Sequence, residues 1–480
     1  MRYDHSFDWD GFYFVAILLV FVGIVLATSR FSVPYIYSAL TSPSTFALED
    51  AMKDPTLAAV ALSSTTPRRV IDRLTIEDAI PSVGNFIGVD LVRMKLYLYR
   101  DGALMEEIPI LSKGRPGTPW ETPSGAYTIG TKEETHFSSI GHVYMPYSMQ
   151  FFGNYFIHGW TYYPDGTPVS ASFSGGCIKL STEDARKVFA FASIGTPVFV
   201  YDSKGSENLP PLSLEGARPD VSSDAYLIAD IDTGDVYAEK NASKERPAAS
   251  LTKLMTALVA NETISLDKTI TLSRGALKNP SDPTDTATKT FLVNDLFYPL
   301  LMQSSDPVAD RLAAYYGADL FVRWMNDKAH ALSMQSTAYV DASGVSQENT
   351  STPEDIYRLL HYLSNKKSFV LSITRTKEKT IVAQDGWQYA VASVNTPVDT
   401  EPFAGGNTGR TTPGEDVSAS ILTINTPTGE RRIAVILLGS NNQAEDVGAL
   451  ASWITLSAKE TSNQAACVAC TLPSYRKIEL

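Results

Sequence analysis

Residues 203–222, "SKGSENLPPLSLEGARPDVS", divide the 480-residue chain into two parts with different apolar patterns. The stretch is rich in Pro, Ser and Gly and has no apolar periodicity, which is typical of a linker between domains. A chain of this length exceeds what one hydrophobic core usually holds, and 44% hydrophobic with 19% charged residues is typical of folded protein. We therefore expect a multidomain protein with a linker at residues 203–221.

The two parts differ in the period of their apolar residues. Residues 86–202 consist of short alternating runs separated by turn signals, such as "KLYLYRDGALMEEIPIL" with Asp101-Gly102 between two apolar runs. This pattern predicts a mainly β domain with a hairpin at that turn. Residues 222–460 begin and end with strand patterns and carry long helical patterns between them. The second domain is therefore expected to be α/β, with a sheet built from both of its ends.

Residues 11–28 are apolar and uncharged over a length that can cross a bilayer as one helix. A cleaved signal peptide is the alternative, but three aspartates accompany Arg2 before this run, which makes a poor signal-peptide n-region. We expect residues 1–30 to be an N-terminal transmembrane anchor, followed by a stalk or accessory segment at residues 31–85. The Lys/Arg balance on the two sides does not determine the orientation of the helix.

Charge and cysteine usage argue against two classes of ligand. The formal net charge is −13 and no Lys/Arg-rich run occurs, whereas nucleic-acid binding requires a basic face. Cys467 and Cys470 form a single C-x-x-C in the tail at residues 461–480. A zinc site would need two further ligands, and no partner motif is visible. Two interpretations of the C-x-x-C remain, a local disulfide or a dispensable tail. We expect no metal and no cofactor.

The remaining cysteine, Cys177, lies between two glycines and an apolar–basic pair in "SGGCIKL". A thiolate nucleophile needs a base that takes its proton and backbone N–H donors for the oxyanion that its attack creates. Gly175 and Gly176 allow the backbone to approach a substrate closely and to aim such donors. His158, in "YFIHGW", follows an apolar run and is expected to end a strand. A buried structural thiol and a satisfied core histidine are the alternatives for each residue alone.

Together, "IHGW" and "SGGCIKL" resemble the L,D-transpeptidase catalytic domain in their order and spacing, and "ILSKGRPGTPWETPSGAYTIG" resembles a glycine-containing stretch of the same family. The resemblance covers residues 86–202. It implies a β-rich domain in which Cys177 is the nucleophile and His158 the base. Gly159 would orient the imidazole through its carbonyl group.

The same resemblance implies that Ser174 and Gly176 shape the pocket around the cysteine. Two positions depart from the family pattern. Gly175 stands where the family has a supporting histidine, so we expect activity with altered binding of the acceptor. Lys179 stands where arginine or asparagine is commoner, and its charge could still attract a substrate carboxylate.

A second candidate site lies in "ASLTKLMTA", where Ser250 and Lys253 are one helical turn apart on the same face. A desolvated lysine amine at this spacing can act as the base for a serine hydroxyl. A helix N-cap followed by an exposed lysine is the alternative for S-x-x-K alone. The surrounding "DAYLIADIDTGDVYAEKNASKERPAASLTKLMTALVA" resembles the penicillin-binding D-alanyl-D-alanine carboxypeptidases. This resemblance covers about residues 222–457 and implies the α/β fold of serine β-lactamases.

Two other motifs of the carboxypeptidase family are altered in this chain. In "LMQSSDPVAD" a carboxylate replaces the amide of S-x-N, and in "GGNTGRTTPGED" an asparagine replaces the lysine of K-T-G. A buried acid beside the catalytic lysine would favour its protonated, non-basic form. We expect either catalysis here or binding of stem peptides without turnover. The residues implied at these motifs are Ser304, Asp306, Asn407, Thr408 and Gly409.

Both resemblances imply one substrate class, the peptide stems of peptidoglycan. At the first site, the Cys177 thiolate would attack the carbonyl that joins the third stem residue to D-alanine. D-alanine would leave, and the thioester would pass to an amine of another stem, or to water in simple trimming. A working Ser250 would remove the last D-alanine from pentapeptide stems. β-Lactams are implied as covalent inhibitors of both nucleophiles.

Because these substrates lie outside the cytoplasm, we expect both domains on the periplasmic or cell-wall side of the cell membrane, held by the single-pass N-terminal helix. A flexible linker between the domains would raise the local concentration of the trimmed donor. Two other classes stay open. One is a membrane-anchored scaffold that holds stem peptides at inactive sites, and the other is a membrane-anchored protease with the same thiol chemistry.

Overall fold

The computed structural model describes residues 68–69, 76–170, 174–202, 209–273, 275–277, 287–395, 402–411 and 414–460. These residues fall within one compact unit. The predicted anchor at residues 11–28 and the pair Cys467 and Cys470 lie outside them. Within the described part of the chain, none of the helices combines the length and the apolar composition that crossing a bilayer requires.

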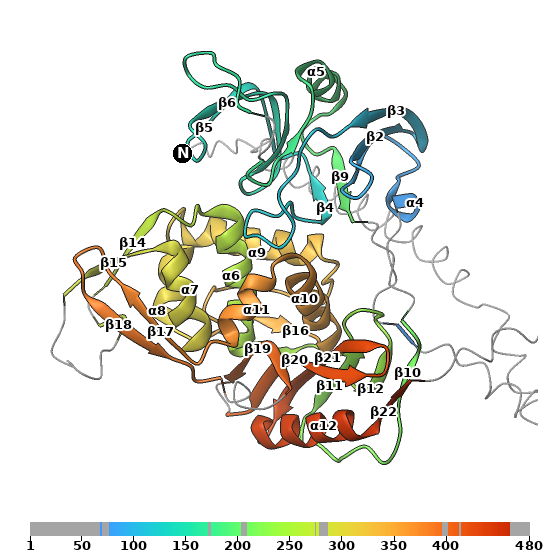
Figure 1. The fold of residues 1–480 in the computed structure, drawn as a ribbon, viewed down its shortest axis with the longest axis vertical. Helices are drawn as coiled ribbons and strands as arrows, with labels where there is room; N and C mark the ends of the chain where they lie inside the picture. The colour runs from blue at the N-terminus through green and yellow to red at the C-terminus, as the bar shows by residue number, and fades with distance from the viewer. Residues whose placement is uncertain are drawn as a thin grey trace, which may run out of the picture. The chain divides into compact units, whose positions relative to one another are not determined.

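Strands predominate in the amino-terminal domain (Figure 1). They form one sheet of order β3-β2-β1-β9-β4 and another of order β5-β6-β7-β8. The expected mainly β domain is confirmed. The strands are β1 (Asn85–Asp90), β2 (Lys95–Arg100), β3 (Ala103–Pro109), β4 (Gly125–Thr128), β5 (Thr131–Ser138), β6 (Val143–Phe152), β7 (Tyr155–His158), β8 (Ile178–Lys179) and β9 (Pro197–Tyr201), and the helices are α4 (Ile76–Ala79) and α5 (Thr182–Phe191).

The first predicted hairpin has the geometry that its sequence favours. In β2, Leu96 and Leu98 are buried while the alternate residues, Lys95, Tyr97 and Tyr99, are part exposed, so one face of the strand packs into the core. Asp101 and Gly102 join β2 to β3 with φ values of 50° and 80°. A two-residue turn with both φ angles positive matches the twist of the strands it connects.

The second domain has a central sheet of order β12-β11-β21-β20-β19, with neighbouring strands antiparallel. Its strands come from both ends of the domain, as predicted. Helix α12 packs on one face and a group of helices covers the other (Figure 1). The bounds are β11 (Ala225–Asp230), β12 (Val236–Lys240), β19 (Phe403–Arg410), β20 (Asp416–Thr426), β21 (Gly429–Ser440), α6 (Thr252–Thr263), α7 (Val293–Met302), α8 (Asp306–Ala313), α9 (Ala318–Ala331), α10 (Pro353–Lys366), α11 (Ser368–Thr374) and α12 (Gln443–Ser457).

Short elements complete the second domain. Three small sheets are formed by β13 with β16, β14 with β15, and β17 with β18. The bounds are the 3-10 helix η1 (Ala249–Leu251), β13 (Arg246–Pro247), β14 (Thr269–Leu272), β15 (Lys289–Leu292), β16 (Thr350–Ser351), β17 (Glu378–Val382) and β18 (Gln388–Ala392).

Helix α6 is buried over its whole length, including the polar residues Thr256, Asn261 and Glu262. Helices α7, α8, α9 and α11 contact it. A helix surrounded in this way cannot shift without disturbing several neighbours. The start of α6 is therefore a rigid place for the Ser250–Lys253 pair.

The predicted linker is partly a strand, which corrects the expectation of an unstructured tether. β10 (Leu212–Leu214) pairs antiparallel with β22 (Ala458–Glu460), and Leu212 is buried in the core beneath α12. Apolar periodicity could not reveal this element, because it is three residues long and contains one buried residue. Its partner strand lies near the far end of the domain, so no local pattern indicates the pairing.

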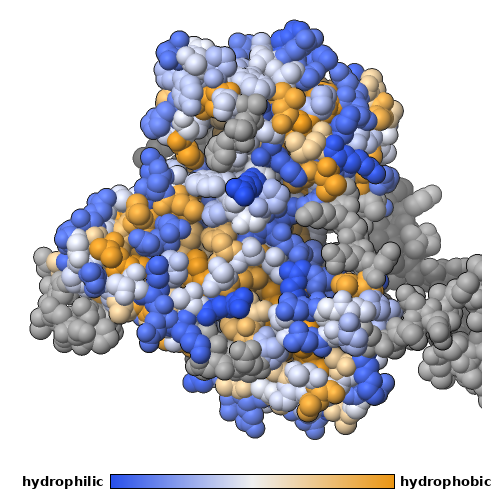
Figure 2. All heavy atoms as spheres, in the orientation of Figure 1, coloured by the Kyte–Doolittle hydropathy of each residue, from blue (hydrophilic) through white to orange (hydrophobic). Residues whose placement is uncertain are grey.

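The two domains are also in direct contact. Ala331, from α9, belongs to the core of the amino-terminal domain, and Trp324 packs against the cores of both. The domains are therefore joined by packed side chains as well as by the segment at residues 203–221, a contact that the sequence analysis did not predict. Elsewhere, on the face in Figure 2, hydrophobic residues occur in groups separated by hydrophilic ones, as is usual for a folded protein.

Candidate active sites

A parallel strand pair brings His158 and Cys177 to the same face of a sheet. β7 ends at His158, and β8 begins at Ile178, directly after Cys177. Ile157 lies opposite Ile178 and His158 opposite Lys179. Paired residues on neighbouring strands share a face, so Lys179 lies on the face of His158, and Cys177, two residues before Lys179, is expected on that face by alternation.

The His158 imidazole is held by the next residue in the chain. Its Nδ1 lies 2.6 Å from the carbonyl oxygen of Gly159. A carbonyl can only accept, so Nδ1 carries the proton and Nε2 is the unprotonated nitrogen. Burial lowers the pKa of His158 to about 4, the charges of Lys179 and His136 also lower it, and the Gly159 hydrogen bond opposes them. His158 is therefore a neutral base at pH 7.

The Cys177 thiol is partly exposed, and its sulfur lies 3.6 Å from the carbonyl oxygen of Asn154, to which it donates. Burial raises the pKa of Cys177 to about 11, while a backbone hydrogen bond at Phe156 and the charge of Lys179 act in the opposite direction. At pH 7 Cys177 is thus a thiol and His158 a neutral imidazole. A thiol in this state needs a base in the reaction itself.

The residues beside Cys177 have little freedom, with one exception. Gly176 has a φ of 104°, and a Cβ atom there would lie 2.3 Å from the Tyr155 ring, so only glycine fits. The Ser174 hydroxyl donates to the carbonyl oxygen of Cys177. At Gly175, where the family has a histidine, a Cβ atom would meet no atom within 4 Å. That position opens to space around the site.

Lys179 is buried rather than exposed. Its ammonium lies 5.4 Å from the centre of the Trp160 ring, and its backbone is hydrogen bonded to Ser112. Burial lowers the pKa of Lys179. The described contacts of Lys179 place its charge beside Cys177 and His158, where it lowers both pKa values.

Thr122 is a site residue that sequence reasoning missed. Its hydroxyl donates to the carbonyl oxygen of Gly176 at 2.8 Å and accepts from the Gly114 amide at 2.8 Å. It lies in the segment that resembles the transpeptidase family, but a lone threonine in a loop carries no signal for this contact. Residues 113–122, between β3 and β4, thus form a wall of the cysteine site.

Ser250 and Lys253 face one another at the start of the central helix. Ser250 is in η1 and Lys253 in the first turn of α6, and Lys253 Nζ donates to Ser250 Oγ at 3.2 Å. Ala249 has a φ of 45°, a conformation that is strained for a residue with a side chain. Gly344 holds this turn tightly, because a Cβ atom there would lie 2.0 Å from the Ala249 carbonyl oxygen.

Asp306, the acid beside Lys253, is partly exposed, whereas the sequence analysis expected it to be buried. Lys253 Nζ donates to the Ser343 carbonyl at 2.6 Å and forms an ion pair with Asp306 Oδ1 at 2.6 Å, but the Asp306 side chain is 49% exposed. Burial lowers the pKa of Lys253, although the hydrogen bond and charge of Asp306 raise it. Burial prevails because the lysine side chain is wholly enclosed while water screens the carboxylate.

Strand β19 forms another side of the serine site. Asn407 is buried, and its Nδ2 donates to the carbonyl oxygen of Ser250 at 3.0 Å. A Cβ atom at Gly409 would lie 2.8 Å from Ser250 Cβ, so the strand approaches the serine closely. Thr408 Oγ1 lies 3.5 Å from Asn395 Oδ1. The nearby Arg410 pairs with Asp416 at 2.7 Å rather than replacing the missing lysine.

Of the residues that replace the S-x-N motif, Asp306 contacts Lys253, and Ser304 is not among the described partners of Lys253 or Ser250. Ser304 has a φ of 52° in the turn before α8, and Asp306 is the first residue of that helix. The structure therefore brings Ser250, Lys253, Asp306, Asn407 and Gly409 together.

Both regions match models of known families. Residues 84–200 match the L,D-transpeptidase catalytic domain, and residues 213–442 match D-alanyl-D-alanine carboxypeptidase. Both resemblances expected from the sequence are therefore confirmed.

The second region is also similar to two curated relatives. The D-alanyl-D-alanine endopeptidase of Pseudomonas aeruginosa is 33% identical over 184 residues, 37% of this chain and 58% of the relative. That of Escherichia coli is 27% identical over 201 residues, 40% of this chain and 59% of the relative. The chain thus spans less than two thirds of these relatives. Ampicillin-bound penicillin-binding protein D2 of Listeria monocytogenes is 26% identical, with a TM-score of 0.42, over 49% of this chain and 99% of that structure.

Proposed function

Since the chain carries an L,D-transpeptidase catalytic domain followed by a D-alanyl-D-alanine carboxypeptidase domain, we propose that it modifies peptidoglycan by L,D-transpeptidation at Cys177. The observation that carries this proposal is the hydrogen bond of His158 Nδ1 to the Gly159 carbonyl. It leaves Nε2 as a neutral base on the sheet face that also presents the Cys177 thiol. Gly159 is the positioning residue for that base.

In the proposed reaction, His158 Nε2 takes the thiol proton as Cys177 attacks the carbonyl between the third stem residue and D-alanine. The tetrahedral intermediate collapses to a thioester, and the D-alanine amine leaves with the proton from His158. An amine of a second stem then attacks the thioester, gives its proton to His158 and releases the thiol. Water in place of the amine gives trimming instead of a cross-link.

Electrostatics support a base that acts during the attack. The thiol pKa of about 11 and the imidazole pKa of about 4 hold both groups neutral at pH 7. An entering substrate therefore does not have to separate a thiolate–imidazolium ion pair. Backbone N–H groups around Gly176 and Cys177 would stabilise the oxyanion, with Ser174 and Thr122 fixing the adjoining carbonyls.

For the second domain we propose a weaker serine acylation site. Lys253 contacts Ser250 Oγ and has a lowered pKa, as a serine base requires. The Asp306 ion pair opposes loss of the lysine proton, and Asn407 supplies a hydrogen bond without charge. Thr408 would contribute to the substrate side of β19. The domain would trim pentapeptide stems slowly or bind them without turnover.

The competing interpretation is a scaffold that binds stem peptides at two inactive sites. Covalent capture separates the two. After exposure of the protein to a carbapenem, peptide mapping by mass spectrometry should find an adduct on Cys177, and a penicillin should label Ser250. Folded protein without either adduct would favour the scaffold. An all-L peptide as substrate would separate a protease from a stem-peptide enzyme.

The same proposal places the protein on the periplasmic or cell-wall side of the cell membrane, anchored by residues 11–28. Stem peptides as substrates and the apolar composition of that segment support it. Membrane fractionation with protease protection in intact cells tests it. Release of the intact chain into the soluble fraction would contradict the anchor.

A further inference from the structure

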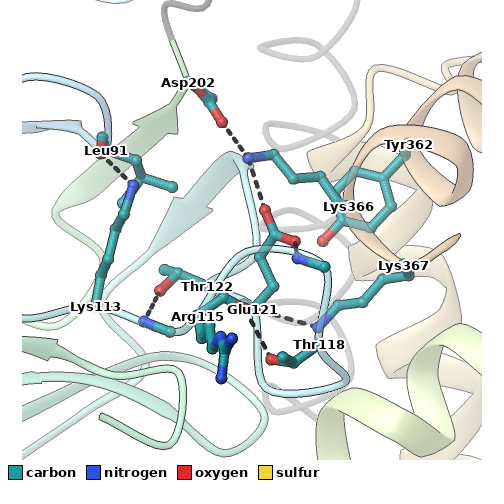
Figure 3. A network of polar contacts seen from close by, with 12 residues as sticks. Leu91, Lys113, Arg115, Thr118, Glu121, Thr122, Asp202, Tyr362, Lys366 and Lys367 are labelled. Carbon is teal, nitrogen blue, oxygen red and sulfur yellow. Dashed lines mark hydrogen bonds and ion pairs between the residues drawn. The ribbon is translucent and has the colours of Figure 1, made fainter. Parts of the chain in front are cut away.

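Lys367 reaches from the carboxypeptidase domain to the wall of the cysteine site. It lies between α10 and α11 and is wholly buried. Its Nζ donates to the carbonyl oxygens of Pro119 at 2.8 Å and Glu121 at 2.9 Å, and to the Tyr155 hydroxyl at 3.2 Å. Figure 3 shows the lysine pointing into the loop that holds Glu121 and Thr122.

Tyr155, which Lys367 contacts, packs on Gly176, and so does Trp120, which lies between the two loop residues whose carbonyls Lys367 contacts. A Cβ atom at Gly176 would lie 2.3 Å from the Tyr155 ring and 2.9 Å from the Trp120 carbonyl oxygen. In the same loop, Thr122 donates to the Gly176 carbonyl. A peptide unit is planar, so fixing the Gly176 carbonyl also fixes the direction of the Cys177 N–H.

We propose that Lys367 is a positioning residue for the L,D-transpeptidase site, supplied by the carboxypeptidase domain. Through three hydrogen bonds it holds residues 119–121 and Tyr155, and these hold the Gly176–Cys177 peptide under the nucleophile. The inference rests on the proposed role of Cys177. It means that the cysteine site is completed by the second domain.

Lys367 is itself fixed by a buried polar network. Its Nζ lies 4.0 Å from Glu262 Oε1, at the end of α6. Glu262 also pairs with Lys328 at 2.8 Å and accepts from the Tyr362 hydroxyl at 2.8 Å. Lys328 in turn donates to the Tyr127 hydroxyl of the amino-terminal domain at 2.9 Å. Charged groups with this many partners have few alternative arrangements.

The neighbouring lysine provides a matched control. Lys366 also crosses between the domains, where it pairs with Glu121 Oε1 at 3.2 Å and with Asp202 Oδ2 at 2.5 Å (Figure 3). It bonds side-chain carboxylates, whereas Lys367 bonds the loop backbone and Tyr155. Loss of Lys366 removes two interdomain ion pairs but keeps the donors to the loop carbonyls of Pro119 and Glu121.

The experiment compares Lys367→Met with Lys366→Met in the full-length protein. The second-order rate of Cys177 acylation by a carbapenem is measured by mass spectrometry. We expect a loss of about tenfold or more for Lys367→Met, since small misplacements of reacting groups have effects of this order, and a change within about twofold for Lys366→Met. Equal rates in Lys367→Met and wild type would overturn the proposal.

A double-mutant cycle separates positioning from a general structural role. If Lys367 acts through the loop that Thr122 anchors, Thr122→Val and Lys367→Met should not add, and the double variant should react about as fast as the slower single variant. Fully additive losses would contradict the proposal. If Lys367→Met does not fold, Tyr155→Phe removes one acceptor of Lys367 and keeps the ring against Gly176.

Alkylation of Cys177 by iodoacetamide distinguishes failure of this inference from failure of the proposed function. The reaction needs no enzyme activity, and peptide mapping separates Cys177 from Cys467 and Cys470. Loosening of the loop should raise the alkylation rate of Cys177 severalfold in Lys367→Met and leave Lys366→Met unchanged. A wild-type protein inert to carbapenem would refute the transpeptidase proposal. Unchanged alkylation in Lys367→Met would refute the positioning role.

Discussion

At the residue scale, one backbone carbonyl and one buried lysine define the chemistry of the cysteine site. The Gly159 carbonyl selects the tautomer of His158, and the charge of Lys179 lowers the pKa values of His158 and Cys177. The resemblance to the L,D-transpeptidase family implied roles for His158, Gly159 and Cys177. It could not indicate that Lys179 is buried, because burial depends on Trp160 packing over it.

Substitution of Lys179 should change the pH dependence of acylation. In the wild type, the rate of Cys177 acylation should fall as the pH drops through about 4, where His158 becomes protonated. Removing the cation in Lys179→Met should raise the pKa of His158 and move this fall to higher pH. Rates of carbapenem acylation between pH 3.5 and 8 measure it. Lys187→Met, at an exposed side chain of α5, is the control, and an unmoved profile in Lys179→Met would contradict the electrostatic role.

Substitution by alanine should have different effects at Gly175 and at Gly176. Gly176→Ala must accommodate a positive φ and a contact of 2.3 Å with the Tyr155 ring, so we expect a loss of stability of more than about 1 kcal/mol and loss of acylation. Gly175→Ala meets open space and should change stability by less than about 0.5 kcal/mol. Urea denaturation and carbapenem labelling measure both. Equal effects at the two positions would contradict the packing described.

At the element scale, strong local patterns predicted the structure and weak ones did not. The Asp101-Gly102 hairpin and the Ser250–Lys253 turn follow from short-range sequence signals. The strand β10 at Leu212–Leu214 does not, because its partner β22 lies at the other end of the domain. The sequence also could not predict that Asp306 is partly exposed, because its exposure depends on how α8 begins beside α6.

Restoring the family amide at the start of α8 should strengthen the serine site. Asp306→Asn removes the carboxylate that raises the pKa of Lys253, so the lysine becomes a better base for Ser250. We expect penicillin acylation of Ser250 to become several times faster. The loss of an acid at a helix N-terminus should cost about 0.3–1 kcal/mol of stability. Asp319→Asn, in the first turn of α9, is the control, and a slower Asp306→Asn would contradict this account.

At the scale of the whole molecule, the two domains form a single packed body around a buried polar network rather than two tethered units. Sequence patterns located both family-matched regions and the two candidate nucleophiles, Cys177 and Ser250. They did not reveal the contact, because Lys367, Glu262 and Tyr155 read as ordinary core or surface positions in their own segments. The groups proposed to react at the cysteine site, above all the His158–Gly159 pair, nevertheless lie in the amino-terminal domain, and the role proposed for the second domain is only a positioning one.

Turnover of tetrapeptide stems tests the central claim most directly. Full-length wild type, Cys177→Ser and His158→Gln would each be incubated with tetrapeptide stems, and the products would be read by mass. The account predicts release of D-alanine with cross-linked or trimmed stems for the wild type, and neither product for the two variants. Stem turnover that persists in Cys177→Ser, or wild-type protein that binds stems without releasing D-alanine, would contradict it.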